Sequence, residues 1–167
     1  MQQARTQKSA AAQLETPRSE NGRAMQIAGL RYHYADEPWK GLAEQWQRFV
    51  SHMGKIPGQV GRTAYGVNFL LPNGVDYLAG VEVSGNSALP EDFATVSIPA
   101  QKYLAFPHRE HVSKLHETCG MAGEWLAANG YEVFRSAGAP DFFERYTEEF
   151  NPSRGTGGME IWIPIKS

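Results

Sequence analysis

The apolar and polar positions of the chain fall into two successive blocks that predict the same order of elements. In the first block, residues 24–35 have the pattern of a strand, and a helical pattern follows. Two further predicted strands, 63–71 and 75–84, are joined by Pro72-Asn73-Gly74, a sequence suited to a hairpin turn. The first block therefore predicts a β-α-β-β unit.

The predicted helix of the first block begins near Asp36, a candidate N-cap, with Pro38 in its first turn. Its apolar residues recur at steps of three and four, and Gly54 follows as a stop signal. These apolar residues are Trp39, Leu42, Ala43, Trp46, Phe49, Val50 and Met53. We expect their stripe to face a core.

The second block repeats this order. Residues 93–108 predict a long strand interrupted by Pro99-Ala100-Gln101, and residues 110–129 predict an amphipathic helix. The apolar stripe of this helix consists of Val112, Leu115, Cys119, Ala122, Trp125 and Leu126. Residues 142–150 and 159–165 then predict a second hairpin around a glycine-rich loop.

Two blocks with one order of elements predict an internal duplication, with repeat 1 at about 24–85 and repeat 2 at about 93–166. We expect an α+β fold in which two β-α-β-β units, related by a pseudo-twofold axis, place two long helices on one face of an antiparallel sheet. A ligand pocket is expected at the seam between the units. Residues 1–23 predict a flexible polar tail outside the domain 24–167, in which the alanine run allows a short helix at 8–14.

Composition narrows the class of protein. The formal charge is −2, with 16 basic and 18 acidic residues spread along the chain, which disfavours direct binding of nucleic acid. The single cysteine, Cys119, excludes an intramolecular disulfide, and we predict neither a metal site nor a cofactor. No segment has the pattern of a signal peptide or the length of a membrane span, so we expect a cytoplasmic protein.

The candidate chemistry lies in the second predicted hairpin. Strand alternation places Glu144 with Tyr146, and it places Glu160 with Trp162 opposite an apolar, core-facing set. We expect these four residues to share the non-helical face of neighbouring strands, two acids beside two aromatic rings. Aromatic faces and a carboxylate in a partly apolar cleft both attract positive charge, so the predicted ligand is a lipophilic cation.

Alternation alone favours a different interpretation, in which these carboxylates lie on a solvated sheet face and pair with Arg145 or Arg154. Further aromatic residues are candidates for the wall of a pocket, although each is individually more typical of packing. These candidates are Tyr65, Phe69, Tyr77 and Trp39.

Several short segments carry a family resemblance through their order and spacing between residues 25 and 166. They are Tyr65-Gly66-Val67, FATVSIPAQKYLAF at 93–106, Glu124-Trp125-Leu126, Phe143-Glu144-Arg145-Tyr146 and EIWIPI at 160–165. In these segments the chain resembles the GyrI-like, or AraC-type, effector-binding domains. The resemblance implies a duplicated β-α-β-β fold with a ligand pocket along the seam.

The resemblance also implies roles for residues. In members that sense multidrug-type cations, a buried glutamate of the penultimate strand receives the charge, and the matching position here is Glu144, followed by Tyr146. Glu160 matches an acidic position in the last strand that can assist in receiving this charge. The resemblance therefore favours a pocket position for Glu144 over the solvated sheet face. For Glu160 it shifts the preference in the same direction, but less strongly. Members of the resembled family frequently have a small residue at the position of Arg109. We therefore expect the pocket rim of this chain to differ from theirs.

Three functions follow from the resemblance. The first is a bacterial ligand-binding module for transcription regulation, a sensor or sequestering protein that acts through a partner such as a DNA-binding protein. Many members carry a helix-turn-helix domain, but 23 polar residues leave no room for one, so we expect a stand-alone member. The second is hydrolysis of strained cyclopropane-type genotoxins by the pocket Glu and Tyr. The third is inhibition of DNA gyrase, which no charged patch of the sequence supports.

Overall fold

The computed structural model describes residues 14–85 and 88–167, which form an α+β fold with one antiparallel sheet and two α-helices. The strands are β1 (Arg18–Gly22), β2 (Met25–Tyr34), β3 (Gln59–Leu71), β4 (Gly74–Val83), β5 (Ala94–Ile98), β6 (Gln101–His108), β7 (Phe142–Tyr146) and β8 (Met159–Pro164). The helices are α2 (Leu42–Val50) and α3 (Leu115–Ala128), and the 3-10 turn η1 (Val112–Lys114) directly precedes α3. The predicted fold class is confirmed at this level.

The strand order places the two sequence blocks side by side. The order is β1-β6-β8-β7-β3-β4-β2-β5, so the first block contributes β3-β4-β2 and the second contributes β7-β8-β6. Strands β3 and β7 pair at the centre, and they are the seam between the blocks. The duplication and its pseudo-twofold axis stay predictions.

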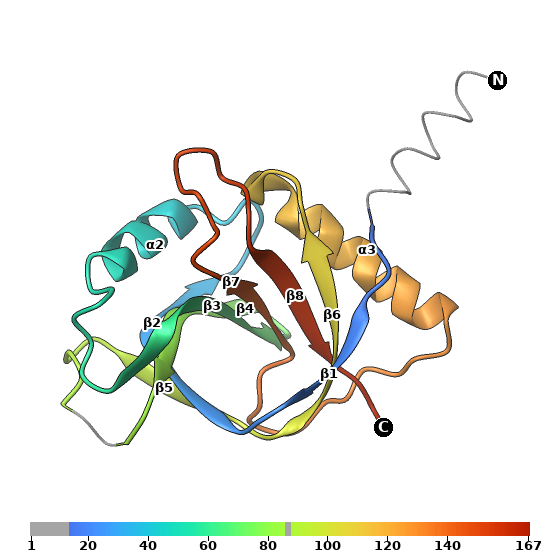
Figure 1. The fold of residues 1–167 in the computed structure, drawn as a ribbon, viewed down its shortest axis with the longest axis horizontal. Helices are drawn as coiled ribbons and strands as arrows, with labels where there is room; N and C mark the ends of the chain where they lie inside the picture. Colours follow the sequence, from blue (N-terminus) through green and yellow to red (C-terminus); the bar gives the residue numbers. More distant parts are fainter. Residues whose placement is uncertain (1–13, 86–87) are drawn as a thin grey trace.

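Two long bent strands connect the ends of the sheet. Strand β1 runs into β2, and β5 runs into β6, after a break of two residues each. Gly22 of β1 pairs with Gln101 of β6. Met25, three residues onward, pairs with Ile98, three residues back, so the register is unchanged across both breaks. The two ends of the sheet therefore belong to one continuous strand pair, and the sheet curls (Figure 1).

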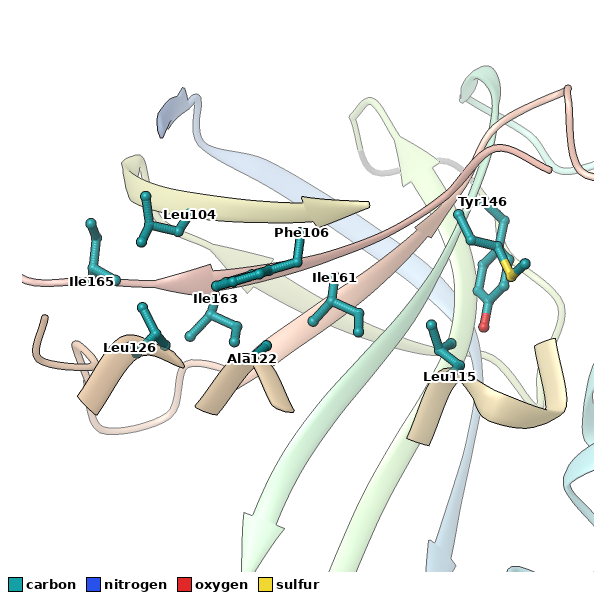
Figure 2. Packing of buried hydrophobic residues seen from close by; sticks show 10 residues of the cluster. Leu104, Phe106, Leu115, Ala122, Leu126, Tyr146, Ile161, Ile163 and Ile165 are labelled. Atoms are coloured by element: carbon teal, nitrogen blue, oxygen red, sulfur yellow. The ribbon is translucent and has the colours of Figure 1, made fainter. Parts of the chain in front are cut away.

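The curled sheet buries a different cluster on each face. Helices α2 and α3 lie outside the curl, on its convex face (Figure 1). Helix α2 packs through Phe49 on β2 and β4, and α3 packs through Leu115, Ala122 and Leu126 on β6 and β8 (Figure 2). The concave face buries residues from strands β2 to β7. These include Ile27, Tyr65, Val67, Leu78, Val96, Tyr103 and Phe143.

Helix α2 begins later than predicted. Asp36 is not its N-cap, because the helix starts at Leu42 after Gly41, whose φ of 95° is left-handed and interrupts helical geometry. Pro38 therefore lies in the preceding turn rather than in the first helical turn. As a result, Trp39 belongs to the segment that leads into the helix.

The predicted tail boundary is wrong in its last part. Arg18–Gly22, assigned to the tail, form strand β1 and pair with β6 along the edge of the sheet. Their polar sequence conceals the strand, because an edge strand with exposed side chains shows no apolar alternation. Residues 1–13, with most of the short helix expected at 8–14, lie outside the described residues. Within the described ranges, no helix is long and apolar enough to cross a membrane.

Helix α3 contains an exposed glycine, and replacing it is expected to stabilise the protein. A Cβ at Gly120 would meet no atom within 4 Å. Gly120→Ala is therefore expected to raise the free energy of unfolding by about 0.5–1 kcal/mol, because alanine loses less backbone entropy in a helix. Urea denaturation measures the change. An unchanged or lower stability would mean that space around Gly120 is needed for packing.

Candidate functional site

Glu144 lies on the seam. It belongs to β7 and pairs with Gly66 of β3 and with Ile161 of β8. Its side chain points to the convex face, which carries both helices, and the residue is only 8% exposed. The carboxylate is therefore buried where the two sequence blocks meet.

Neutral donors surround the Glu144 carboxylate. Its Oε1 accepts hydrogen bonds from the hydroxyls of Tyr77, at 2.7 Å, and Tyr146, at 2.6 Å. Its Oε2 accepts a hydrogen bond of 3.2 Å from Nδ2 of Asn68. Nε1 of Trp46 donates to the Tyr77 hydroxyl at 3.2 Å. We call Glu144, Tyr77, Tyr146, Asn68 and Trp46 the Glu144 cluster.

Burial sets the protonation chemistry of the cluster. It raises the pKa of Glu144, and the hydrogen bonds from Tyr146, Tyr77 and Asn68 act against this rise. Burial also raises the pKa of Tyr77 and Tyr146 well above the ordinary value, and the nearby Glu144 charge adds to it. Both hydroxyls therefore stay protonated and act as donors.

Gly66 makes room for the cluster. A Cβ at this position would lie 2.0 Å from the Tyr77 hydroxyl oxygen and 2.6 Å from Oε1 of Glu144. The hydrogen bond between these two side chains thus passes directly over the Gly66 backbone. No larger residue fits here without displacing one of them.

Aromatic rings cover the cluster on the side of α2. Trp46 lies 5.3 Å from Tyr146 and 6.2 Å from Tyr77, in both cases edge-on. Trp39 stacks on Tyr34 at 5.0 Å and meets Tyr77 edge-on at 5.6 Å. The carboxylate is thus held among rings whose faces can receive a cation.

The predicted grouping of Glu144 and Tyr146 with Glu160 and Trp162 is wrong. Phe143 pairs with Trp162, and paired residues of neighbouring strands point to the same face, so Trp162 lies on the concave face with Phe143. Glu144 and Tyr146 point to the convex face. A shift of one residue in the pairing of β7 with β8 exchanges the faces, and alternation within each strand does not determine that pairing.

Glu160 already has positive partners. It pairs with Arg145 at 3.2 Å and with Arg18 of β1, and it accepts a hydrogen bond of 3.0 Å from Nε1 of Trp162. The Arg145 guanidinium lies 5.1 Å from the centre of the Trp162 ring. The acid and the ring predicted to bind a cation thus bind the cations of the chain itself. Pairing with Arg145, part of the solvated-face interpretation, is confirmed for Glu160.

Four of the eight predicted site residues come together. Tyr77 and Trp39 join Glu144 and Tyr146 on the convex face. The other four, Glu160, Trp162, Tyr65 and Phe69, lie on the concave face. Tyr65 and Phe69 therefore do not form a wall beside Glu144.

Three residues of the site were not predicted as part of it: Asn68, Gly66 and Trp46. Asn68 is 2% exposed, although its strand is otherwise apolar at this point. A polar residue inside an apolar strand is itself a signal, because burial requires a hydrogen-bonding partner. Trp46 was predicted as a core residue. Its ring nitrogen has the additional role of donating a hydrogen bond to the Tyr77 hydroxyl.

The Glu144 carboxylate is closed off in this structure. A cavity of about 150 Å³ lies under α3, lined by Cys119, Gly123, Phe142 and Ile161 among others. A larger cavity of about 650 Å³ lies next to β5. Neither is lined by Glu144. On the side of α2, a ligand can reach the carboxylate only by displacing part of the aromatic cover.

Comparison with known proteins places this geometry in context. The family model Cass2, described as integron-associated effector binding protein, matches residues 20–165. The transcriptional regulator BrlR of Pseudomonas aeruginosa is 30% identical over 146 residues, which are 85% of this chain and 52% of BrlR. The chain thus spans about half the length of this curated relative.

Solved structures show the same fold. SAV2435 bound to tetraphenylphosphonium has a TM-score of 0.71 at 18% identity, over 92% of this chain and 95% of that chain. The integron cassette protein from the mobile metagenome of Vibrio cholerae has a TM-score of 0.64 at 15% identity, over 92% and 97%. The C-terminal domain of EcmrR has a TM-score of 0.66 at 13% identity, over 92% and 98%. At these identities the likeness establishes the fold.

Proposed function

The chain belongs to the family of integron-associated effector-binding proteins, and on this basis we propose that it binds a small hydrophobic cation at the Glu144 cluster. The ligand would place its positive charge on the Glu144 carboxylate and its apolar groups against Trp46, Trp39 and Tyr77. The solved structure of SAV2435 with tetraphenylphosphonium supports a ligand of this chemistry.

The observation that carries the proposal is a buried carboxylate that forms no ion pair within the described residues. His116, which pairs with Glu37 at 2.7 Å, contributes only a coulombic effect that lowers the pKa of Glu144. Glu144 accepts hydrogen bonds from Tyr77, Tyr146 and Asn68, all of them neutral. None of the ion pairs within residues 14–85 and 88–167 includes it. Neutral donors only partly offset the cost of burying a charge, so a cation would be the most favourable addition to this site.

The seam supplies space for the apolar part of such a ligand. The cavity of about 150 Å³ under α3 is lined mainly by apolar residues and includes Ile161, the strand partner of Glu144. If the two blocks are repeats of one unit, the ligand lies on their pseudo-twofold seam, between α2 and α3. Access from the side of α2 then requires movement of Trp46 or Trp39, which cover the carboxylate there.

Calorimetric titration with tetraphenylphosphonium tests the proposal directly. Tetraphenylborate has the same shape and the opposite charge, so it is the matched control. We expect the phosphonium to bind and the borate to bind at least about 100-fold more weakly, because the borate would bring a second negative charge to a buried carboxylate. Equal affinity for the two would exclude charge recognition.

The raised pKa of Glu144 predicts how cation binding depends on pH. Only the ionised carboxylate attracts a cation, so affinity is expected to fall as the pH drops through the raised pKa of the folded state. The same shift predicts that the ligand-free protein loses stability as the pH rises from the ordinary carboxyl range to this raised value. Titrations with tetraphenylphosphonium at acidic and neutral pH, with Glu144→Gln as the reference, measure the first effect. Affinity that is independent of pH would contradict it.

The relatives support a proposal for the biological role. BrlR is a transcriptional regulator, and in such a protein a cation site would sense a compound and report it to the remainder of the molecule. We propose that this chain is the sensing or sequestering module. Binding of DNA gyrase stays a prediction, which a pull-down from a bacterial lysate would test.

Hydrolysis is a second candidate function at the same carboxylate. Burial raises the pKa of Glu144, which makes its carboxylate a stronger base, and two tyrosine hydroxyls lie within hydrogen-bonding distance. A cyclopropane-containing alkylator should then be turned over by the wild type and not by Glu144→Gln. Stable binding without turnover would leave only the binding function.

A further inference from the structure

The cavity of about 650 Å³ is separate from the Glu144 cluster. It lies beside β5, between Arg31 of β2, the end of β3 at Phe69 and the segment 136–141 that leads into β7. Arg31 and Phe69 belong to the concave face, whereas Glu144 belongs to the convex face. A volume of this size is typical of pockets for small molecules.

The cavity runs along a free strand edge. Thr95, Val96 and Ser97 all line it, although successive residues of a strand point to opposite faces. A cavity that contacts all three must therefore lie at the edge of β5. Within residues 14–85 and 88–167, strand β5 pairs only with β2, so its other edge presents backbone amides without a strand partner in these ranges.

Arg31 presents a fixed guanidinium to the cavity, and Asp76 pairs with it on one side. Its guanidinium carbon lies 4.1 Å from the centre of the Phe69 ring. Nε and Nη2 both contact Oδ2 of Asp76, at 3.1 and 3.0 Å, which leaves Nη1 without a hydrogen bond to any residue in the described ranges. Two interactions thus hold the guanidinium in place while one nitrogen stays available for a ligand.

The acids near the cavity are already neutralised. Asp76 pairs with Arg31 through Oδ2, and its Oδ1 lies 2.7 Å from Nδ1 of His33. Asp141, which lines the cavity, pairs with Arg135 at 2.5 Å and accepts a hydrogen bond of 2.7 Å from the Leu70 amide. A negative ligand would therefore approach Arg31 without facing an unpaired carboxylate.

We propose that this cavity is a second binding site, which takes a small amphipathic carboxylate. The carboxylate would accept hydrogen bonds from Arg31 and from the edge amides of β5, and the apolar part would lie against Phe69, Val96 and Ala139. Because the two sites lie on opposite faces of the sheet and prefer opposite charges, the chain would bind a cation and an anion at the same time.

A ligand series with one apolar body and three head groups tests the proposal. The probes are 4-butylbenzoate, the neutral 4-butylbenzamide and the cationic 4-butylbenzylamine, added to the isotopically labelled full chain. We expect only the benzoate to shift the amide resonances of 94–98 and 136–141 in NMR spectra. Equal shifts from the benzamide, or benzoate shifts confined to other segments, would overturn the proposal.

Two variants separate this site from general surface binding. Arg31→Gln is expected to weaken benzoate binding by about tenfold or more, as for the loss of one charge-assisted contact. Ala139→Phe should block the cavity and have the same effect without removing a charge. The control Arg62→Gln changes an exposed arginine that does not line the cavity and should leave affinity unchanged. Undiminished benzoate binding by both Arg31→Gln and Ala139→Phe would exclude this site.

Discussion

Replacing Glu144 with glutamine is expected to weaken tetraphenylphosphonium binding by about 100-fold, which corresponds to the loss of one buried charge interaction. Glutamine has nearly the same shape, and its Oε1 can still accept hydrogen bonds from Tyr77 and Tyr146. Its amide nitrogen can donate to Asn68 once the Asn68 amide turns its oxygen towards it, so the cluster should stay packed. Calorimetry of the purified variant against the wild type measures the effect.

Glu160→Gln is the matched control for this experiment. Glu160 was also predicted as a cation receptor, but Arg145 and Arg18 already neutralise it on the concave face. Its replacement should leave the affinity for tetraphenylphosphonium within about twofold, since no buried charge contact with the ligand is lost. A large loss in Glu160→Gln, with none in Glu144→Gln, would mean that the cation binds on the concave face.

The unfolding temperature of Glu144→Gln tests independently whether the variant is correctly folded. A carboxyl group whose pKa is raised on folding costs the native state stability at every pH above its unfolded-state pKa, so the wild type carries this cost at neutral pH. The glutamine variant should therefore unfold at a temperature equal to or above that of the wild type. A markedly lower unfolding temperature would indicate that weak binding reflects a damaged fold.

Gly66→Ala is expected to have the second largest effect. The new Cβ would lie 2.0 Å from the Tyr77 hydroxyl oxygen, so Tyr77 or Glu144 must move and their hydrogen bond is lost. We expect a loss of about 1–3 kcal/mol in the free energy of unfolding, typical of overpacking in a core. Cation affinity should also fall, because the carboxylate is no longer held in position.

The same substitution at Gly120 is the control for Gly66→Ala. Gly120 has open space around it and should become more stable as alanine, whereas Gly66 should become less stable. Urea denaturation of both variants compares the two free energies directly. If Gly66→Ala retains both wild-type stability and wild-type affinity, the close contact at the seam has no role in the site.

The order of elements could be predicted because it rests on local periodicity. Alternation and the three- to four-residue steps predicted β2, α3 and both hairpins. Strand β1 was missed because Arg18–Gly22 are polar, although the second block offered an indirect signal. Residues 93–108 were predicted as a long interrupted strand, and β1 with β2 forms the corresponding interrupted strand of the first block.

The site could be predicted only in part. Glu144, Tyr146 and Tyr77 were expected to contribute, and they share hydrogen bonds. Asn68 and Trp46 were missed because a strand asparagine and a helix tryptophan have no distinctive spacing to Glu144. Their positions 76 and 98 residues away in the chain are brought to the carboxylate only by strand pairing and helix packing.

The amino-acid order by itself determined the types of element, the two hairpins and the presence of acids beside aromatic residues in β7 and β8. These properties depend on neighbours within a few positions, which a linear pattern contains. Only the tertiary structure decided that Glu144 lies with Tyr77 under α2, and that Glu160 lies on the other face with Arg145. The reason is physical: the face on which a residue lies depends on strand register, which long-range packing of the whole sheet selects.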